Sequence, residues 1–487
     1  MSTIETAEII AALESWSGTA KLSAQELRLA SDRLVIALDR DHTLHHVWLV
    51  LSVLGRGLPS EAEVREAHRT LLNEGAEALL TQVGRQPGLK KVAHRQVELL
   101  HDAVIVDVRH TAETDLATGI QRVARETSKR WAQSHDITLV TWTADGLAMR
   151  RLLPAERATA LDGAAPVHGK TGSIDKHIVV PVGGSYLLPE LAAEPWRTLR
   201  LAAMAEFGGV NTGVIGFDCV PLTTAETVGD GMPGAFARNL SAVAKMDRVA
   251  AISDAAAVEY SGWRRMLSSS GIPGPLVDSV LLAAEPGKST PQDEREFAQL
   301  VALDDTPLVL VVGSHEPRKN HLAVLQAAEL AWREGLQFRL IFVGGNAWNS
   351  LDFTDTLESL KRNSRSVDSV SALPDRLLWA GYRLSRFTIF TSINEGFGLP
   401  VAESLASGTP VITSNHGSMK QIVAAGGAIV VDPRDDDDIL RGIRSMLADE
   451  DLYARLRAEA AGYVIRPWDD YASDLWNYFI GSEAKNG

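Results

Sequence analysis

The loop at residues 391–403 (TSINEGFGLPVAE) carries two carboxylates, Glu395 and Glu403, eight positions apart across a glycine-rich turn. An apolar, strand-like run precedes the loop and a helix-like pattern follows it, so the loop lies where parallel sheets bind ligands. Gly396 and Gly398 allow a sharp turn and a close ligand approach. The two carboxylates can accept hydrogen bonds from hydroxyl groups on two parts of one extended ligand. The alternative is a glycine turn before a helix whose early glutamate suits the helix dipole.

A second loop, GSHEPRKN at residues 313–320, also follows a strand-like run (PLVLVV) and precedes a helix. Asn320 is a favourable N-cap residue for that helix. Arg318 and Lys319 stand at the helix start, where positive charge opposes the macrodipole. This mismatch indicates that both cations bind an anion, for which a diphosphate is the natural candidate. A solvated basic pair is the alternative.

A third loop follows the first strand-like run of the N-terminal half, and Gly119 opens the helix after it. A glycine before a helix is common, so this signal is weak alone. Together the three loops predict a site between two lobes. The C-terminal lobe supplies cations and carboxylates that fit a nucleotide sugar, and the N-terminal lobe brings an acceptor.

The elements that position these loops alternate between short apolar strands and helices, which is typical of parallel sheets with right-handed crossovers. Residues 1–98 read as helical throughout and predict a separate accessory module. We expect an N-terminal Rossmann-like domain at 99–290 and a C-terminal one at 291–487, whose last helix crosses back to the first lobe. The expected strands are 103–108, 137–142, 177–182, 214–220 and 249–253, then 307–312, 338–343, 387–391, 410–413 and 428–431. The expected helices include 7–16, 120–134, 189–206, 235–246 and 255–267, then 320–333, 400–406, 417–425, 436–447 and 452–463.

The composition is that of an ordinary globular protein of 487 residues, with 45% hydrophobic residues and a net charge of −14. This acidity argues against a duplex nucleic-acid binder. Cys219 is the one cysteine of the sequence, so no intrachain disulfide can form. We expect it to be a core residue within an apolar strand. The N-terminus lacks a basic signal-peptide region, and apolar runs such as 47–54 are too short to span a bilayer. We therefore expect a cytoplasmic protein, with peripheral attachment to the inner face of the plasma membrane as an option.

The acidic run at 435–438 invites a metal interpretation, but it directly precedes a helix, where capping and the helix dipole explain it. No metal site and no cofactor are predicted.

The segments GSHEPRKNHLAVLQAA, FVGGNAW and FTIFTSINEGFGLPVAESLASGTPVITSNHGSM resemble the retaining glycosyltransferases of family four, which have the GT-B fold. The ATGIQRVARE stretch is similar to the N-terminal signature of the bacterial O-antigen and capsule mannosyltransferases in that family. The resemblance covers roughly residues 103–480. It implies an α/β protein with two facing Rossmann-like domains, plus the N-terminal all-α module.

The resemblance also implies roles for single residues. Arg318 and Lys319 would contact the donor diphosphate and stabilise the leaving group, Glu403 would bind the ribose, and Gly119 would lie against the diphosphate in the closed state. Glu395 would hold the donor hexose, together with the backbone at Phe397, Gly398 and Leu399. The implied reaction is transfer of a hexose with retention, through an oxocarbenium-like transition state and without a metal.

One position departs from the family pattern. Many relatives carry His-Asp where this chain has Phe217-Asp218. Asp218 either orients the acceptor or has a structural role, and both stay open. A catalytically silent scaffold of the same fold is therefore an alternative to the transferase.

The best hypothesis is transfer of mannose from GDP-mannose onto a glycan or lipid-linked oligosaccharide, with other GDP- or UDP-hexoses open. Residues 45–85 resemble a helical module of bacterial surface-polysaccharide proteins, which implies docking to other transferases or to a membrane.

Overall fold

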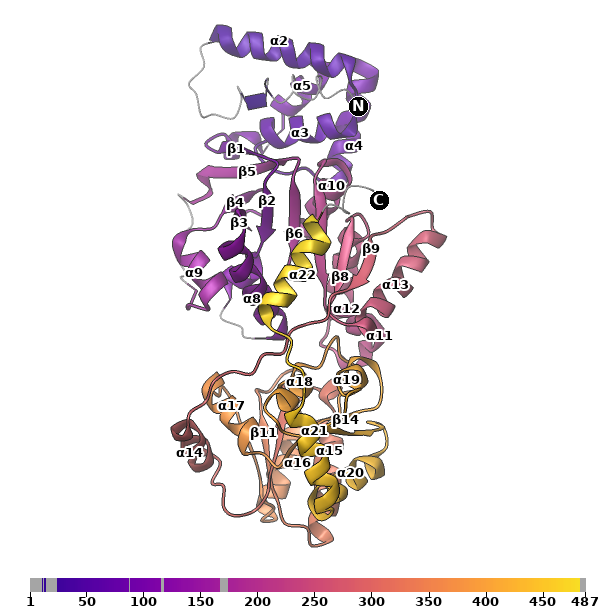
Figure 1. Ribbon diagram of the computed structural model, residues 1–487. Coiled ribbons are helices and arrows are strands. Elements are labelled where there is room, and N and C mark those ends of the chain that lie inside the picture. The colour runs from indigo at the N-terminus through magenta and orange to yellow at the C-terminus, as the bar shows by residue number, and fades with distance from the viewer. Residues whose placement is uncertain are drawn as a thin grey trace.

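The structure is a computed structural model that describes residues 11, 13–14, 24–86, 88–114, 118–166 and 174–481. It shows a helical module, an N-terminal α/β domain and a C-terminal α/β domain, stacked along one axis (Figure 1). The expected helix at 7–16 falls mostly outside the described residues. Among the helices that the structure describes, none is long and apolar enough to cross a membrane.

The helical module packs against the N-terminal domain, at the end that lies away from the C-terminal domain (Figure 1). Ser60 caps one of its helices in a capping box with Glu63. The module shares one hydrophobic core with the domain, and His45 Nδ1 donates to the Phe207 carbonyl at 2.8 Å. The module is therefore packed as an integral part of the N-terminal domain. Its helices are α2 (Ala24–Arg40), α3 (Leu44–Leu54), α4 (Glu61–Glu74), α5 (Ala76–Gly84) and α6 (Leu89–Val92).

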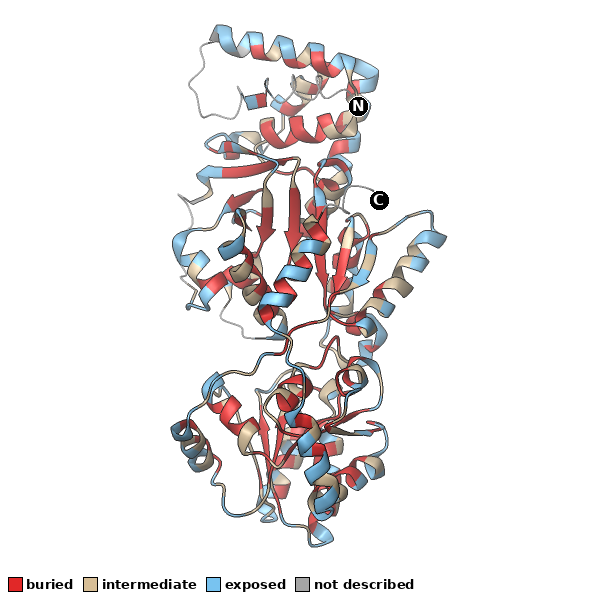
Figure 2. Ribbon diagram, in the orientation of Figure 1, coloured by how far each residue is buried: buried red, intermediate tan, exposed pale blue. Residues whose placement is uncertain are grey.

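The N-terminal domain is built on a sheet of nine described strands in the order β1-β5-β4-β3-β2-β6-β7-β8-β9, parallel except for β4. Its central strands are buried on both faces, which explains their solid apolar runs (Figure 2). The strands are β1 (Gln96–His101), β2 (Val104–Asp107), β3 (Ile137–Trp142), β4 (Met149–Arg151), β5 (His177–Val182), β6 (Ser185–Leu188), β7 (Asn211–Gly216), β8 (Arg248–Ala251) and β9 (Leu276–Ser279).

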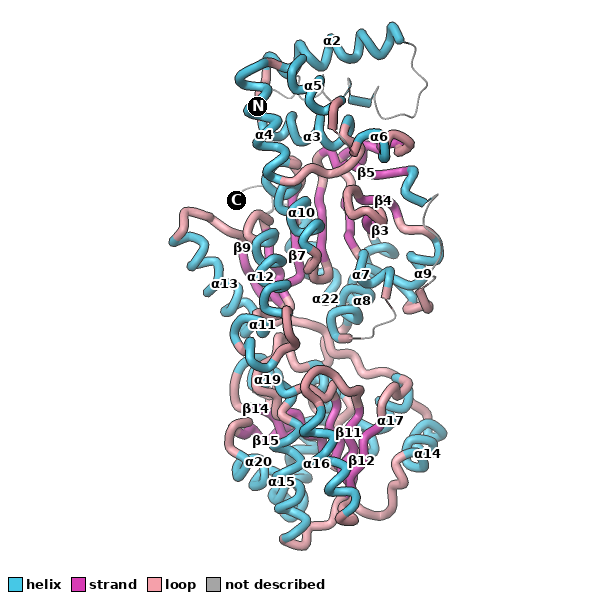
Figure 3. The backbone as a smooth tube through the Cα atoms, turned by 180° about the vertical axis from the view of Figure 1, so that it is seen from behind, coloured by secondary structure: helices cyan, strands magenta, loops and turns pink. Residues whose placement is uncertain are grey.

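Helices cover both faces of this sheet. Helices α8 and α22 lie together on one face, and α10 and α12 lie together on the other (Figures 1 and 3). Helix α22 is the last in the chain, so the C-terminal segment returns to the N-terminal domain. The helices are α7 (Arg109–Glu113), α8 (Gly119–Ser134), α9 (Pro154–Asp162), α10 (Pro195–Phe207), α11 (Val220–Thr223), α12 (Met232–Val243), α13 (Asp254–Ser269) and α22 (Trp468–Ile480).

The C-terminal domain has a parallel sheet of six described strands in the order β12-β11-β10-β13-β14-β15. The strands are β10 (Leu308–Val312), β11 (Arg339–Val343), β12 (Val367–Val370), β13 (Phe387–Phe390), β14 (Val411–Ser414) and β15 (Ala428–Val431). The helices are α14 (Pro291–Leu300), α15 (His321–Arg333), α16 (Leu351–Arg362), α17 (Asp375–Leu384), α18 (Leu399–Ala406), α19 (Gly417–Ile422), α20 (Asp436–Ala448) and α21 (Glu450–Ala461), with the 3₁₀ turn η3 (Pro317–Lys319).

Three expectations differ from the structure. Residues 1–98 are not helical throughout, because residues 96–98 begin strand β1, which pairs with β5. The strand expected at 214–220 ends at Gly216, and Val220 instead starts the short helix α11. Cys219 is therefore buried beside that helix rather than within a strand, and burial raises the pKa of its thiol. The helix expected at 189–206 starts only at Pro195, because strand β6 and a short loop precede it.

Candidate functional site

The two loops of the C-terminal domain predicted to bind a donor lie side by side. Strands β10 and β13 are parallel neighbours, so their carboxyl ends meet at one edge of the sheet. The carbonyl of Arg318 accepts hydrogen bonds from the Ile393 amide and from Ser392 Oγ, both at 2.9 Å. The structure thus joins the Arg-Lys loop to the loop that carries Glu395.

The carboxylate of Glu395 is the centre of a charged cluster. Arg318 Nη1 lies 2.7 Å from its Oε2, and Lys319 Nζ lies 2.6 Å from its Oε1. Burial alone would raise the pKa of Glu395, but the two cations outweigh burial and lower this pKa to about 2. Burial is the larger influence on Lys319, whose pKa is lowered in spite of Glu395. Glu395 is therefore ionised at neutral pH.

Arg318 is held by two further acceptors. Its Nη2 donates to Glu316 Oε1 at 2.7 Å, and its Nη1 donates to the Asn394 carbonyl at 2.8 Å. These contacts fix the guanidinium in a largely buried position beside the loop. Asn320 does not cap helix α15 with its side chain as the sequence predicts. It adopts a left-handed backbone, and its Nδ2 donates to the Pro433 carbonyl instead.

Glu403 lies at the other end of the same loop, in the second turn of α18 rather than the first. Its side chain is 6% exposed, and Tyr382 donates to its Oε2 at 2.9 Å. Its Oε1 accepts from Arg122 of the N-terminal domain at 2.5 Å. Neither Tyr382 nor Arg122 is predicted from the sequence as a partner of Glu403. Arg122 could have been found, because it lies one helical turn after Gly119 and so shares its face.

The glycines of the loop are needed for two different reasons. Gly398 has a φ of +100°, a conformation that suits glycine. A Cβ on Gly396 would lie 2.1 Å from the Phe217 carbonyl oxygen of the N-terminal domain. Phe397 between them is buried, and Leu399 is partly exposed. Gly396 thus lets the loop approach the other domain closely.

Gly119 also lies at the contact between the domains. It begins α8, as predicted, and a Cβ placed on it would lie 3.6 Å from Leu399 Cδ1. The amino-terminal ends of α8 and α18 therefore face each other across the site. Residues 115–117, directly before Thr118, are not among the described residues.

Asp218 stands beside this site, on the N-terminal domain. Its Cβ would be 3.1 Å from a Cβ on Gly396, and its Oδ1 accepts from the Val220 amide at 3.1 Å. Burial and the negative charge of Glu395 raise its pKa to about 6, although Arg318 opposes this shift. Phe217, which precedes it, is buried.

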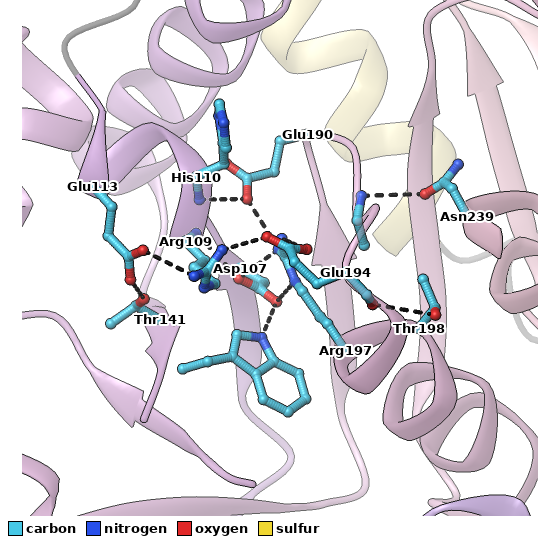
Figure 4. Close-up of polar contacts among 12 residues, drawn as sticks. Asp107, Arg109, His110, Glu113, Thr141, Glu190, Glu194, Arg197, Thr198 and Asn239 are labelled. Atoms are coloured by element: carbon cyan, nitrogen blue, oxygen red, sulfur yellow. Dashed lines mark hydrogen bonds and ion pairs between the residues drawn. The ribbon is translucent and has the colours of Figure 1, made fainter. Parts of the chain in front are cut away.

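A buried network of ion pairs and hydrogen bonds holds helix α7 of the N-terminal domain (Figure 4). Arg197 is fully buried and forms ion pairs with Asp107 and Glu190, both at 2.9 Å. The Glu190 carboxylate accepts from the amides of His110 and Thr111, at the start of α7. The network therefore fixes α7 against the sheet, a few residues before α8 begins.

The acidic run before α20 has the capping role that the sequence predicts. Asp435 accepts from the amides of Asp437 and Asp438. Within the described part of the chain, no group of three or more His, Cys, Asp or Glu side chains is arranged to hold a metal ion.

Known proteins share the sequence and architecture of this chain. Residues 292–462 match the family model of the glycosyl transferases group 1. The serotype-specific mannosyltransferase WbdA of Escherichia coli is 28% identical over 412 residues, which are 82% of this chain and 48% of the relative. The O-antigen chain mannosyltransferase B of Escherichia coli is 35% identical over 145 residues, 29% of this chain and 37% of the relative. The chain thus spans about half the length of WbdA.

A solved structure shares the fold. Anabaena HepE, crystallised with UDP and glucose, superposes with a TM-score of 0.55 at 13% identity, over 78% of this chain and 99% of that chain. The arrangement of two parallel-dominated sheets is the GT-B fold, as expected. The chain thus has the GT-B fold, its residues 292–462 match the group 1 glycosyl transferases, and it is related to the O-antigen mannosyltransferases of Escherichia coli.

Proposed function

We propose that this protein transfers a hexose from a nucleotide sugar, with retention, onto a glycan or lipid-linked oligosaccharide in surface-polysaccharide synthesis. The preferred donor is GDP-mannose, because two relatives are named mannosyltransferases. This chain spans about half the length of WbdA. The activity of the whole protein is therefore part of the proposal.

One observation carries the proposal: Arg318 and Lys319 share the single carboxylate of Glu395. A diphosphate brings more negative charge than one carboxylate and binds an arginine in a bidentate manner. Donor binding would therefore exchange anions at the two cations. Glu395 would then be released to accept hydrogen bonds from the hexose hydroxyls.

The same cations would supply the chemistry. As the bond between the anomeric carbon and the diphosphate oxygen breaks, its electron pair stays on that oxygen. Arg318 and Lys319 would stabilise this charge in a water-poor site, a task that needs no metal. Glu403 would bind the ribose, and the backbone at Phe397, Gly398 and Leu399 would hold the hexose. Gly119 would lie against the diphosphate.

Asp218 would orient the acceptor hydroxyl. It packs against Gly396 from the N-terminal domain, and a carboxyl whose pKa is about 6 can exchange a proton near neutral pH. Phe217 favours the alternative of a silent scaffold, since a buried phenyl ring offers no polar group to a substrate.

The experiment is a donor-turnover assay with GDP-mannose and with other GDP- and UDP-hexoses, in the presence of a chelator and an oligosaccharide acceptor. We expect nucleoside diphosphate release from one donor, insensitivity to the chelator, and retained anomeric configuration by NMR. Specific donor binding without turnover would support the scaffold. Loss of turnover with the chelator would contradict the metal-independent mechanism.

A further inference from the structure

The structure contains one ion pair between the two α/β domains among its described residues, and that pair involves the carboxylate proposed to bind ribose. Arg122 Nη1 of α8 lies 2.5 Å from Glu403 Oε1 of α18. The other described polar contacts across the domain boundary are hydrogen bonds in which at most one group is charged. One example is the bond from Ser253 Oγ to the Gly396 carbonyl. Arg122 therefore occupies a distinct position in the closed molecule.

The surroundings of Arg122 hold it toward Glu403. It lies in the first turn of α8, where its amide donates to the Thr118 carbonyl at 3.0 Å. Its guanidinium lies 5.9 Å from the ring centre of Trp468, at the start of α22. A third of its side chain stays exposed (34%), whereas the Glu403 side chain that it contacts is 6% exposed.

The Glu403 carboxylate retains capacity for a ligand. Tyr382 uses Oε2 and Arg122 uses Oε1, and each carboxylate oxygen accepts about two hydrogen bonds. Two acceptor positions remain for the two ribose hydroxyls. Ribose therefore does not need to displace Arg122, and the arginine and the tyrosine together fix the plane of the carboxylate.

We propose that Arg122 is a donor-positioning residue: from the opposite domain, it holds Glu403 in the orientation that receives the ribose hydroxyls. This inference rests on the proposed function. It makes the ribose site a composite of both domains, which is complete only when they are closed.

The test compares affinities of GDP and UDP, and of their 2′,3′-dideoxy analogues, for the wild type and its variants by calorimetry. Arg122→Ala should weaken binding of the preferred nucleoside diphosphate by about tenfold, the loss expected for one hydrogen bond to a charged group. It should not change binding of the dideoxy analogue, which lacks the hydroxyls that Glu403 would receive. A merely structural role would weaken both ligands equally.

Two further variants sharpen the test. Arg122→Lys keeps the charge and should restore part of the affinity. Arg130→Ala is the matched control, because Arg130 lies on the same helix and pairs with Asp469 without crossing the domain boundary. It should bind like the wild type.

The possible outcomes distinguish a failure of this inference from a failure of the proposed function on which it rests. A wild type that binds no nucleotide overturns both. A wild type that binds the nucleotide, with Arg122→Ala binding it equally or more tightly, overturns the role of Arg122 alone.

Discussion

Lys319 Nζ and Glu395 Oε1 lie 2.6 Å apart, inside a cluster where Arg318 contacts the second oxygen of the same carboxylate. Among the described ion pairs, Lys319 has Glu395 as its partner, whereas Arg318 pairs with both Glu395 and Glu316. The cluster is therefore a stability element in the unliganded protein as well as a proposed donor site.

Glu395→Gln should destabilise the protein at pH 7, because it leaves two buried cations without their shared anion. The folded pKa of Glu395 is depressed to about 2, so its contribution is full above the unfolded pKa and is lost as pH falls toward 2. We expect a loss on the order of 2 kcal/mol at pH 7. The difference from the wild type should shrink below about pH 5.

Urea unfolding at several pH values measures this effect. The control is Glu358→Gln, which removes an exposed surface partner of Lys361 and should change little. Equal losses for the two variants would contradict the account of the cluster.

Asp218→Asn should stabilise the protein above pH 6 and lower its activity. The folded pKa of Asp218 is raised to about 6, so the folded state binds a proton more readily than the unfolded state. Ionising the folded carboxyl therefore costs stability as pH rises from about 4 to above 6. Asparagine avoids this cost and can still accept from the Val220 amide.

Thermal melts at pH 5 and pH 8 check the stability of Asp218→Asn, and acceptor-dependent turnover checks its activity. The gain in melting temperature should be larger at pH 8. A variant that is more stable yet fully active would exclude Asp218 from acceptor orientation and leave it a structural role.

Gly396→Ala should separate the two domains. The added Cβ would lie 2.1 Å from the backbone oxygen of Phe217, which cannot move as a flexible side chain can. We expect an increased radius of gyration by small-angle scattering and weaker nucleotide binding. Gly84→Ala is the control, since a Cβ there meets nothing within 4 Å. An unchanged radius in Gly396→Ala would show that the domains do not meet closely at Gly396 as described.

Deletion of the helical module should destabilise the whole N-terminal domain. Trp48 on α3 is fully buried, and Arg65 on α4 pairs with Glu206 on α10 at 2.8 Å. Trp48→Ala should cost about 3–5 kcal/mol, the usual cost of removing a buried tryptophan. Arg65→Ala at the exposed pair should cost at most about 1 kcal/mol. Urea unfolding measures the free energy of unfolding of both variants. An unchanged free energy of unfolding in Trp48→Ala would mean that the module folds independently of the domain.

Most of the central strands could be predicted, because strands buried on both faces of a parallel sheet are solid apolar runs. The strand at 137–142 matches β3, and the one at 387–391 matches β13. Strand β12 was missed because its sequence, VDSV, includes polar residues that the sheet edge tolerates. The strand expected at 214–220 ran too far because the buried residues of α11 continue the apolar run.

The site was predicted loop by loop but not as a closed unit. Local sequence placed Arg318, Lys319 and Glu395 on adjoining loops, and the structure brings them together. The pairing of Glu403 with Arg122 joins residues 281 positions apart. It depends on how the two domains close, which no local pattern records. Tyr382 was missed because helix α17 was not predicted.

The measurement that tests the central claim most directly is the thermal shift of the protein with GDP, UDP, ADP and their hexose conjugates. A ligand that binds only the folded state raises the melting temperature according to its affinity. We predict that one nucleotide and its hexose conjugate, with GDP and GDP-mannose preferred, stabilise the wild type and the Arg130→Ala control. The same ligands should fail to stabilise Arg318→Ala and Glu403→Ala. No shift with any nucleotide, or equal shifts in all four proteins, would contradict the proposed donor site.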